Sequence, residues 1–178
     1  MPDAPWPEKL TPVLRQLQMI VGSLVAGCTI FLVIALFVSA GREGAEGSPL
    51  VSYIATASGV MALLARALIP PKIIGAGRQK ILRQEGRDAG RGDPLDGPSI
   101  VGRLLQLFAT STIIPCAVIE GAILFLLVAY VVEGWPPALM AAVALIAVLA
   151  LHMPTRSRAI HWIEDQLVLL EQERQRDG

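Results

Sequence analysis

The chain has 178 residues, of which 53% are hydrophobic and only 17% are charged, and its mean hydropathy is +0.57. This composition is too apolar for one soluble domain of this size and indicates a membrane protein. The formal net charge is zero. No aromatic residues interleave the basic ones, so nucleic-acid binding is not expected.

Four long uncharged or nearly uncharged runs predict transmembrane helices. Each can cross about 30 Å of hydrocarbon at about 1.5 Å per residue. No alternating apolar pattern appears, so we expect helices and not barrel strands. The predicted fold class is an all-α polytopic membrane protein, a four-helix transmembrane bundle with spans at 17–40, 50–70, 106–132 and 137–154.

The basic residues predict the orientation. Fourteen of the fifteen Lys and Arg lie in the N-terminal segment, around the middle loop or in the C-terminal tail, and only Arg42 lies in an outer loop. Both termini and the middle loop are therefore expected on the cytoplasmic side of a bacterial-type inner (plasma) membrane. The same basic residues would attract anionic lipid at the cytoplasmic face.

The two halves of the chain share a pattern that predicts a duplicated hairpin. The stretch "LRQLQMI" at 14–20 matches "GRLLQLF" at 102–108, and the same offset aligns Cys28 with Cys116. Each half then reads as helix, short outer loop, helix and cytoplasmic amphipathic segment. Because two spans per copy preserve orientation, the axis relating the copies should run along the membrane normal.

The predicted segments follow from this reading. The middle loop is rich in Gly, Asp and Arg and is expected to be a flexible linker. The segments are a cytoplasmic N-terminal segment, a first transmembrane hairpin with an amphipathic extension, the linker, a second transmembrane hairpin and a cytoplasmic amphipathic tail, at 1–16, 17–82, 83–99, 100–154 and 155–178.

The tail is expected to form an amphipathic helix. Its apolar residues share one helical face, at Ala159, Ile160, Ile163, Leu167 and Leu170. We expect this face to lie on the inner leaflet, with Trp162 as an interfacial anchor. Pairing with the equivalent segment at 73–82 as a short coiled coil is the alternative.

A single glutamate, Glu120, lies in the middle of the third predicted span, in "IIPCAVIEGAILF". Helical rise places it about 18–21 Å from either end of the span. A charge at that depth is costly, and burial disfavours the charged form, so we expect a protonated carboxyl that faces the bundle. Hydroxyl partners are predicted at Tyr53 and Thr56 of the second span and at Thr29 of the first.

Three interpretations of Glu120 remain open: an interhelical hydrogen bond, a proton or cation site, and a contact with a partner subunit. Pro115 lacks the amide that would bond the carbonyl of Ser111, which predicts a kink in the third helix. The freed carbonyl and the hydroxyls of Thr110, Ser111 and Thr112 form a polar patch on the cytoplasmic side of Glu120. Such a patch would suit a path for a proton or cation.

The stretches "ATASGVMALLA" on the second span, "GRQ" at 77–79 and "VIEGAILFLLVAY" around Glu120 together carry a resemblance. A hairpin of this kind, with small-residue-rich helices, resembles the rotor-ring proteolipid (c or K) subunits of rotary ATPases. In that family the glutamate binds H⁺ or Na⁺, and the resemblance implies this role for Glu120. The long middle loop, the lack of a dense glycine repeat and the place of Glu120 in the third of four helices depart from the family pattern.

Other chemistry is not expected. Cys28 and Cys116 lie in apolar helices and are more typical of small packing residues than of a disulfide or metal pair. The sequence has no zinc, phosphate-binding or dinucleotide motif. We therefore expect no metal, no cofactor and no enzymatic activity.

The predicted function is that of a small integral membrane protein whose mid-membrane carboxyl is structural or linked to a proton or cation. Two alternatives are a non-enzymatic subunit of a larger membrane complex and a transporter or channel component. Small residues four apart, such as Ala117 and Gly121, favour close helix packing within the bundle or in a homo-oligomer.

Overall fold

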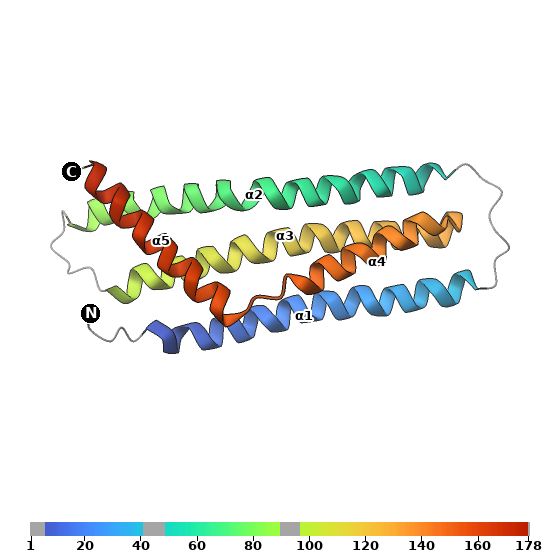
Figure 1. The fold of residues 1–178 in the computed structure, drawn as a ribbon, viewed down its shortest axis with the longest axis horizontal. Coiled ribbons are helices and arrows are strands. Elements are labelled where there is room, and N and C mark those ends of the chain that lie inside the picture. The colour runs from blue at the N-terminus through green and yellow to red at the C-terminus, as the bar shows by residue number, and fades with distance from the viewer. Residues whose placement is uncertain (1–5, 41–48, 90–96, 178) are drawn as a thin grey trace. The chain divides into compact units, whose positions relative to one another are not determined.

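The computed structural model describes residues 6–40, 49–89 and 97–177, which form helices joined by short connections and contain no strand. The all-helical fold class is thereby confirmed. In chain order (Figure 1) the helices are α1 (Trp6–Ser39), α2 (Leu50–Ala89), α3 (Gly97–Glu133), α4 (Pro136–Leu151) and α5 (Arg156–Asp177).

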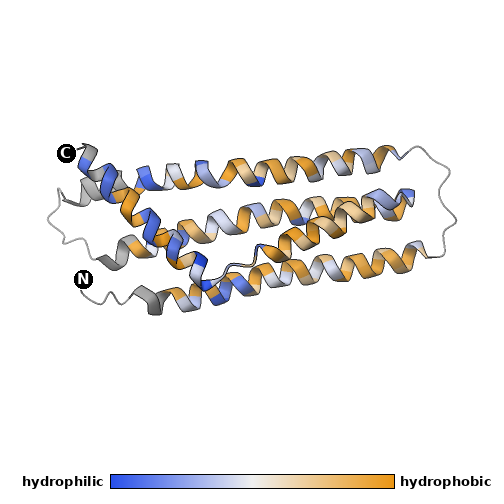
Figure 2. Ribbon diagram, in the orientation of Figure 1, coloured by the Kyte–Doolittle hydropathy of each residue, from blue (hydrophilic) through white to orange (hydrophobic). Residues whose placement is uncertain are grey.

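Three helices within the described ranges are long and apolar enough to cross a membrane, with candidate spans at Leu10–Ser39, Leu50–Ile81 and Val101–Glu133. Helix α4 has 16 residues and forms with α5 a pair bent by 69°. Counting that pair as one span gives a fourth. Figure 2 shows α4 as mostly apolar, while α5 alternates hydrophilic and apolar residues.

Helices α2 and α3 are longer than the sequence patterns predict. Helix α2 runs through Pro70 and Pro71 to Ala89, and α3 begins at Gly97. The prediction of a flexible linker over all of 83–99 is therefore wrong at its two ends, and 90–96 lie outside the described residues. The end of α2 is rich in Arg, Gln and Glu, which are good helix formers, and their propensity outweighs that of the nearby glycines.

The two halves of the chain differ at Pro70 and Pro154, the prolines at the ends of the second and fourth predicted spans. Helix α2 continues past Pro70. In the second half, α4 ends at Leu151 and α5 begins at Arg156, after the bend. Residue His152 ends α4, and its backbone N–H bonds the carbonyl of Leu149. The duplication therefore stays a prediction.

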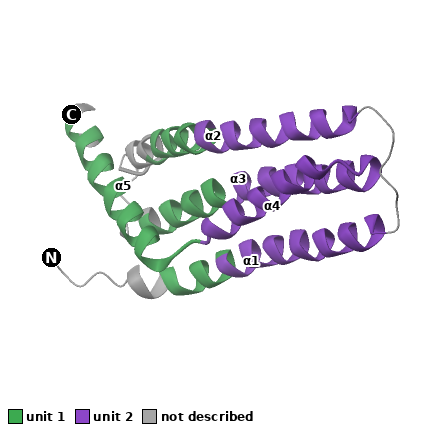
Figure 3. Ribbon diagram, turned by 45° about the vertical axis from the view of Figure 1, so that its right-hand side comes forward, with its two compact units in different colours: residues 1–17, 69–112, 154–178 green, residues 18–68, 113–153 purple. Residues whose placement is uncertain are grey.

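The chain forms two compact units, shown in Figure 3. Unit 1 comprises 1–17, 69–112 and 154–178, and unit 2 comprises 18–68 and 113–153. Helices α1, α2 and α3 each contribute residues to both units.

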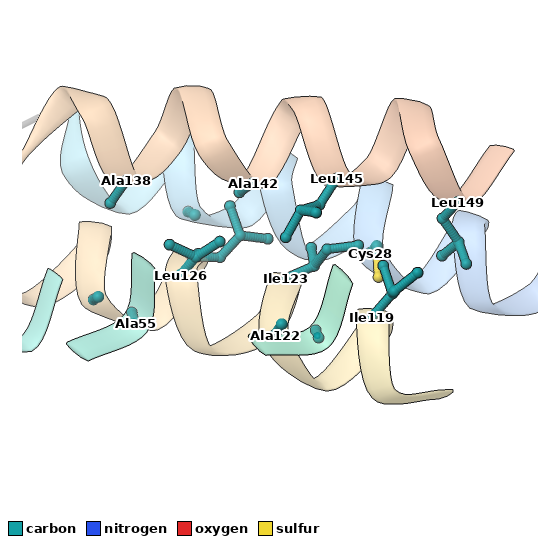
Figure 4. Packing of buried hydrophobic residues seen from close by; sticks show 14 of the residues in the cluster. Cys28, Ala55, Ile119, Ala122, Ile123, Leu126, Ala138, Ala142, Leu145 and Leu149 are labelled. Atoms are coloured by element: carbon teal, nitrogen blue, oxygen red, sulfur yellow. The ribbon is translucent and has the colours of Figure 1, made fainter. Parts of the chain in front are cut away.

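The core of unit 2 is built around α3. In the most apolar 18-residue stretch of each candidate span, 44% of the residues are buried in α3, 17% in α1 and 22% in α2. Helix α3 supplies bulky side chains, including Ile119, Ile123 and Leu126, and α1 and α2 meet them with Cys28 and Ala55 (Figure 4). From α4 come Ala138, Ala142, Leu145 and Leu149. Large residues on one helix against small ones on its neighbours permit close packing in lipid.

Glu133, the last residue of α3, contacts the start of α2 within unit 2. Its carboxylate oxygens accept hydrogen bonds from the backbone N–H groups of Val51 at 2.7 Å and Ser52 at 2.8 Å, in the first turn of α2. These donors have no partner within their own helix. Gly134 follows with a φ of 65°, a conformation that glycine adopts without strain, and α4 then starts on two prolines.

Unit 1 has its own apolar core, and α5 is part of it. The buried residues are Leu10, Leu14, Ile81, Leu104, Leu105, Ala159, Ile163 and Leu170. The predicted apolar face of the tail is therefore confirmed, and within unit 1 other residues of the protein pack against it. Trp162, expected as a membrane anchor, packs instead on the ring of Phe108, with centroids 5.2 Å apart.

Polar contacts also join α5 to α2, the helix that contains the predicted coiled-coil counterpart of the tail. Within unit 1, an Nη of Arg78 donates to Gln166 Oε1 at 3.3 Å, and the other Nη lies 3.4 Å from a carboxylate oxygen of Glu173. Gln166 is buried. Within unit 1 the tail therefore contacts the second half of α2. Docking on the leaflet and pairing as a short coiled coil both stay predictions.

The predicted orientation can be tested by cysteine labelling. We expect cysteines placed at Arg91 and Gln172 to react with an impermeant reagent only from the cytoplasmic side, and one at Glu46 only from outside. Gln172 is exposed on α5, whereas Arg91 and Glu46 lie outside the described residues. Both native cysteines are buried, so background labelling should be low. Reaction of the Glu46 variant from the cytoplasmic side would contradict the orientation.

Candidate functional site

Glu120 lies on α3 within unit 2, at the edge of the buried stripe of that helix. It follows the fully buried Ile119 and is itself half-buried. On its other side, Gly121 is exposed, and a Cβ added there would meet no atom within 4 Å. The carboxyl therefore sits between the core of unit 2 and an open face of α3, and is less enclosed than the sequence suggested.

No hydrogen bond or ion pair joins the Glu120 carboxyl to another residue of the described ranges. An electrostatic neighbour on α1 is the thiol of Cys28, and on α3 Cys116 lies one turn before Glu120. Cys116 in turn lies within the electrostatic range of Arg66 on α2. Three helices thus bring a carboxyl, two thiols and a guanidinium to the same region of unit 2.

Arg66 is a residue that the sequence reasoning missed, because no basic side chain was expected at the depth of Glu120. Helix α2 runs antiparallel to α3, and Glu133 contacts Val51 and Ser52. By helical rise, Glu120 lies about 20 Å from that contact along α3, and Arg66 lies about 22 Å from it along α2. Counting residues from the Glu133 end of α3 and from the Val51 end of α2 would have placed Arg66 at the level of Glu120.

Tyr53 does not lie beside Glu120, which corrects the sequence prediction. It lies in the first turn of α2, where its ring packs on Trp135 with centroids 5.2 Å apart. Helical rise separates it from the level of Glu120 by about 17 Å. The sequence prediction assigned Tyr53 to Glu120 because the register of α2 against α3 was not known from the sequence.

The two predicted threonine partners are engaged elsewhere. Thr56 lies about 13 Å from the level of Glu120 by the same count. Its hydroxyl donates to the carbonyl of Ser52 at 2.8 Å. Thr29 is exposed, and its hydroxyl donates to the carbonyl of Val25 at 2.8 Å. Each threonine hydroxyl donates its hydrogen bond to a carbonyl in the preceding turn of its own helix, so it cannot also donate one to Glu120.

Pro115 is buried, and α3 continues through it as one helix. In unit 1, the hydroxyls of the predicted polar patch also bond the backbone of α3. Thr110 donates to the carbonyl of Gln106 at 2.9 Å, while Ser111 and Thr112 donate to that of Phe108 at 3.0 Å and 2.8 Å. The predicted path for a proton or cation along this side stays a prediction.

Within the described ranges no group of three or more His, Cys, Asp and Glu side chains could ligate a metal ion. Both cysteines there are free thiols. Comparisons of the chain with protein-family models, with curated proteins and with solved structures give no match.

Proposed function

We propose that this protein is a small, non-enzymatic integral membrane protein in which Glu120 on α3 binds and releases a proton or a small monovalent cation. The observation that carries the proposal is a half-buried carboxyl in a candidate membrane span with no hydrogen-bond partner among the described residues. A carboxylate in hydrocarbon is costly without a counter-charge. Protonation or cation binding removes that cost.

The surroundings of Glu120 support a site that can change its charge. Cys28 of α1 is its electrostatic neighbour, Cys116 lies one turn away on α3, and Arg66 of α2 is within electrostatic range of Cys116. The guanidinium of Arg66 places a positive charge in this region, and the core of unit 2 around it is apolar. The resemblance of "VIEGAILFLLVAY" to rotor-ring proteolipids points to the same chemistry.

The proposal is tested by labelling the purified protein in detergent with a hydrophobic carbodiimide over a series of pH values. We expect Glu120 to be modified, because the reagent reacts with a protonated carboxyl in an apolar site, and we expect labelling to fall as the pH is raised. Na⁺ should slow the reaction if the site also takes a cation. Glu133 serves as an internal control in the same sample, because both its oxygens accept backbone hydrogen bonds. Glu120 labelled no faster than Glu133 at any pH would contradict the proposal.

Substitutions of Glu120 distinguish a site that binds and releases a proton from a carboxyl that only joins two helices. Glu120→Gln and Glu120→Leu should both leave thermal stability near that of the wild type, because no interhelical hydrogen bond is lost. If Glu120 instead joins two helices by a hydrogen bond, Glu120→Leu should cost about 1–2 kcal/mol while Glu120→Gln costs less. A marked loss confined to the leucine variant would therefore restore the structural interpretation.

A second candidate is a subunit of a larger membrane assembly, favoured by the open face of α3 beside Glu120. Ala117 and Gly121 lie on that face, and both are exposed. Small residues four apart permit close approach of another helix. Native mass spectrometry of the protein in mild detergent would detect an oligomer, and Gly121→Leu would then be expected to dissociate it without unfolding the monomer.

A further inference from the structure

A cavity of about 390 Å³ lies in unit 1, between the second half of α2 and the start of α3. Its polar lining comes from Lys80 of α2 and from Arg103, Gln106 and Thr110 of α3. Ile81 and Leu107 add apolar surface. No acidic side chain lines it within the part of the chain that the structure describes, so the cavity presents positive charge beside an apolar wall.

Close approach of the two helices shapes this cavity at Gly77. A Cβ added to Gly77 would lie 2.5 Å from Cδ1 of Leu107, which is closer than side chains tolerate. Glycine at this point therefore lets Leu107 lie against α2. The cavity opens one turn further along, where Lys80 and Ile81 face Arg103 across the gap.

The cavity lies where two candidate spans end. One span of α2 ends at Ile81, and the span of α3 begins at Val101. Both ends belong to the side on which the basic residues gather, which the positive-inside rule makes cytoplasmic. Residues at such an end lie at the level of lipid headgroups, with acyl chains beginning beside them.

The donors in the cavity match a phosphate group. The Lys80 ammonium has three N–H donors and no ion pair with another described residue, and the Gln106 amide adds two more. Arg103 makes another interaction in the protein, and its guanidinium carries five N–H groups in a planar fork. The Thr110 hydroxyl donates to the carbonyl of Gln106, so toward a ligand it can only accept a hydrogen bond.

We propose that this cavity binds the phosphate of an anionic phospholipid, with Lys80 and Arg103 on the headgroup and the first part of an acyl chain along Ile81 and Leu107. The apolar wall and the place of the cavity at the end of two spans favour a lipid over a free phosphate. Lipid binding at this cavity does not depend on the role of Glu120, so either proposal can fail alone.

The test is native mass spectrometry of delipidated protein in detergent, titrated with phosphatidylglycerol or with phosphatidylcholine. We expect one phosphatidylglycerol to bind the wild type first and more tightly than any later lipid, and phosphatidylcholine to bind more weakly. Lys80→Gln should weaken the first binding event by about fivefold, which is the share of one basic residue near an anionic surface. Arg103→Gln should do the same if that variant folds as the wild type does.

The matched control is Lys72→Gln, which removes the same charge from an exposed site on the same helix and does not line the cavity. Equal weakening by Lys72→Gln and Lys80→Gln would overturn the proposal, because it would show general attraction to basic residues. Glycerol 1-phosphate provides the second arm. If it competes with phosphatidylglycerol at equal concentration, the cavity is a phosphate site without a lipid preference, and the assignment to a phospholipid is wrong.

Discussion

Replacing Glu133 with alanine is expected to lower the melting temperature of this protein more than replacing any other described carboxyl residue. Glu133 accepts hydrogen bonds from the N–H groups of Val51 and Ser52, which have no partner within α2 because they lie in its first turn. A residue with a side-chain oxygen usually precedes such a helix and satisfies these donors. Residue 49 is a proline, which has no such oxygen, so a side chain from α3 takes that role. The negative charge also suits the positive end of the α2 dipole.

Glu133→Gln should fall between the wild type and Glu133→Ala, because glutamine keeps one acceptor oxygen and loses the charge. Thermal unfolding in detergent, followed by circular dichroism, measures both variants. Glu171→Ala is the matched control, since Glu171 is exposed on α5 and makes no hydrogen bond or ion pair with another described residue. A Glu133→Ala protein that melts together with the control would show that the two hydrogen bonds contribute nothing measurable.

Hydrophobic patterning predicted the helices well, because a helix in an apolar medium satisfies its backbone hydrogen bonds from its own residues. The first predicted span at 17–40 lies within α1 apart from its last residue, and the third at 106–132 lies within α3. The fourth, at 137–154, ran past Leu151, where helix gives way to the connection before α5. Composition could not predict the bend between α4 and α5, because the second and fourth predicted spans both end at a proline. Pro70 lies inside α2, whereas Pro154 follows the end of α4.

Contacts between helices were beyond the reach of pattern reasoning, because they depend on the register of one helix against another. Tyr53 was assigned to the depth of Glu120 and lies instead beside Trp135 in the first turn of α2. The contact of Glu133 with the start of α2 was not predicted at all. Arg66 was overlooked at the depth of Glu120. Counting residues from the contact between Glu133 and the start of α2 would have corrected both the placement of Tyr53 and the omission of Arg66.

The tail shows a different limit of sequence reasoning. Its apolar periodicity predicted which face of α5 is buried, and Ala159, Ile163 and Leu170 are indeed buried. The same periodicity suits a lipid surface and a protein surface equally, so it could not say what covers the face. In unit 1 the covering residues come from three other helices, among them Leu10, Ile81 and Leu104.

Ile163→Ala is therefore expected to destabilise unit 1 by about 2–5 kcal/mol, as truncation of a fully buried isoleucine does when the cavity cannot collapse. Ile163 has 0% of its surface exposed, among the side chains of the unit 1 core. Val168→Ala is the control, because Val168 lies on the same helix with 55% of its surface exposed. Exposed substitutions of that kind change stability by about 0.5 kcal/mol or less.

Two measurements distinguish protein packing from docking on a membrane. Thermal unfolding in detergent should show a clear loss for Ile163→Ala and none for Val168→Ala. Limited trypsin digestion should cut Ile163→Ala faster at Arg156 and Arg158, which are exposed at the start of α5, because a helix with weaker packing opens more often. If α5 is held by lipid and not by the core of unit 1, Ile163→Ala should unfold and digest as Val168→Ala does in detergent, and its effect should appear only when bilayer binding is measured.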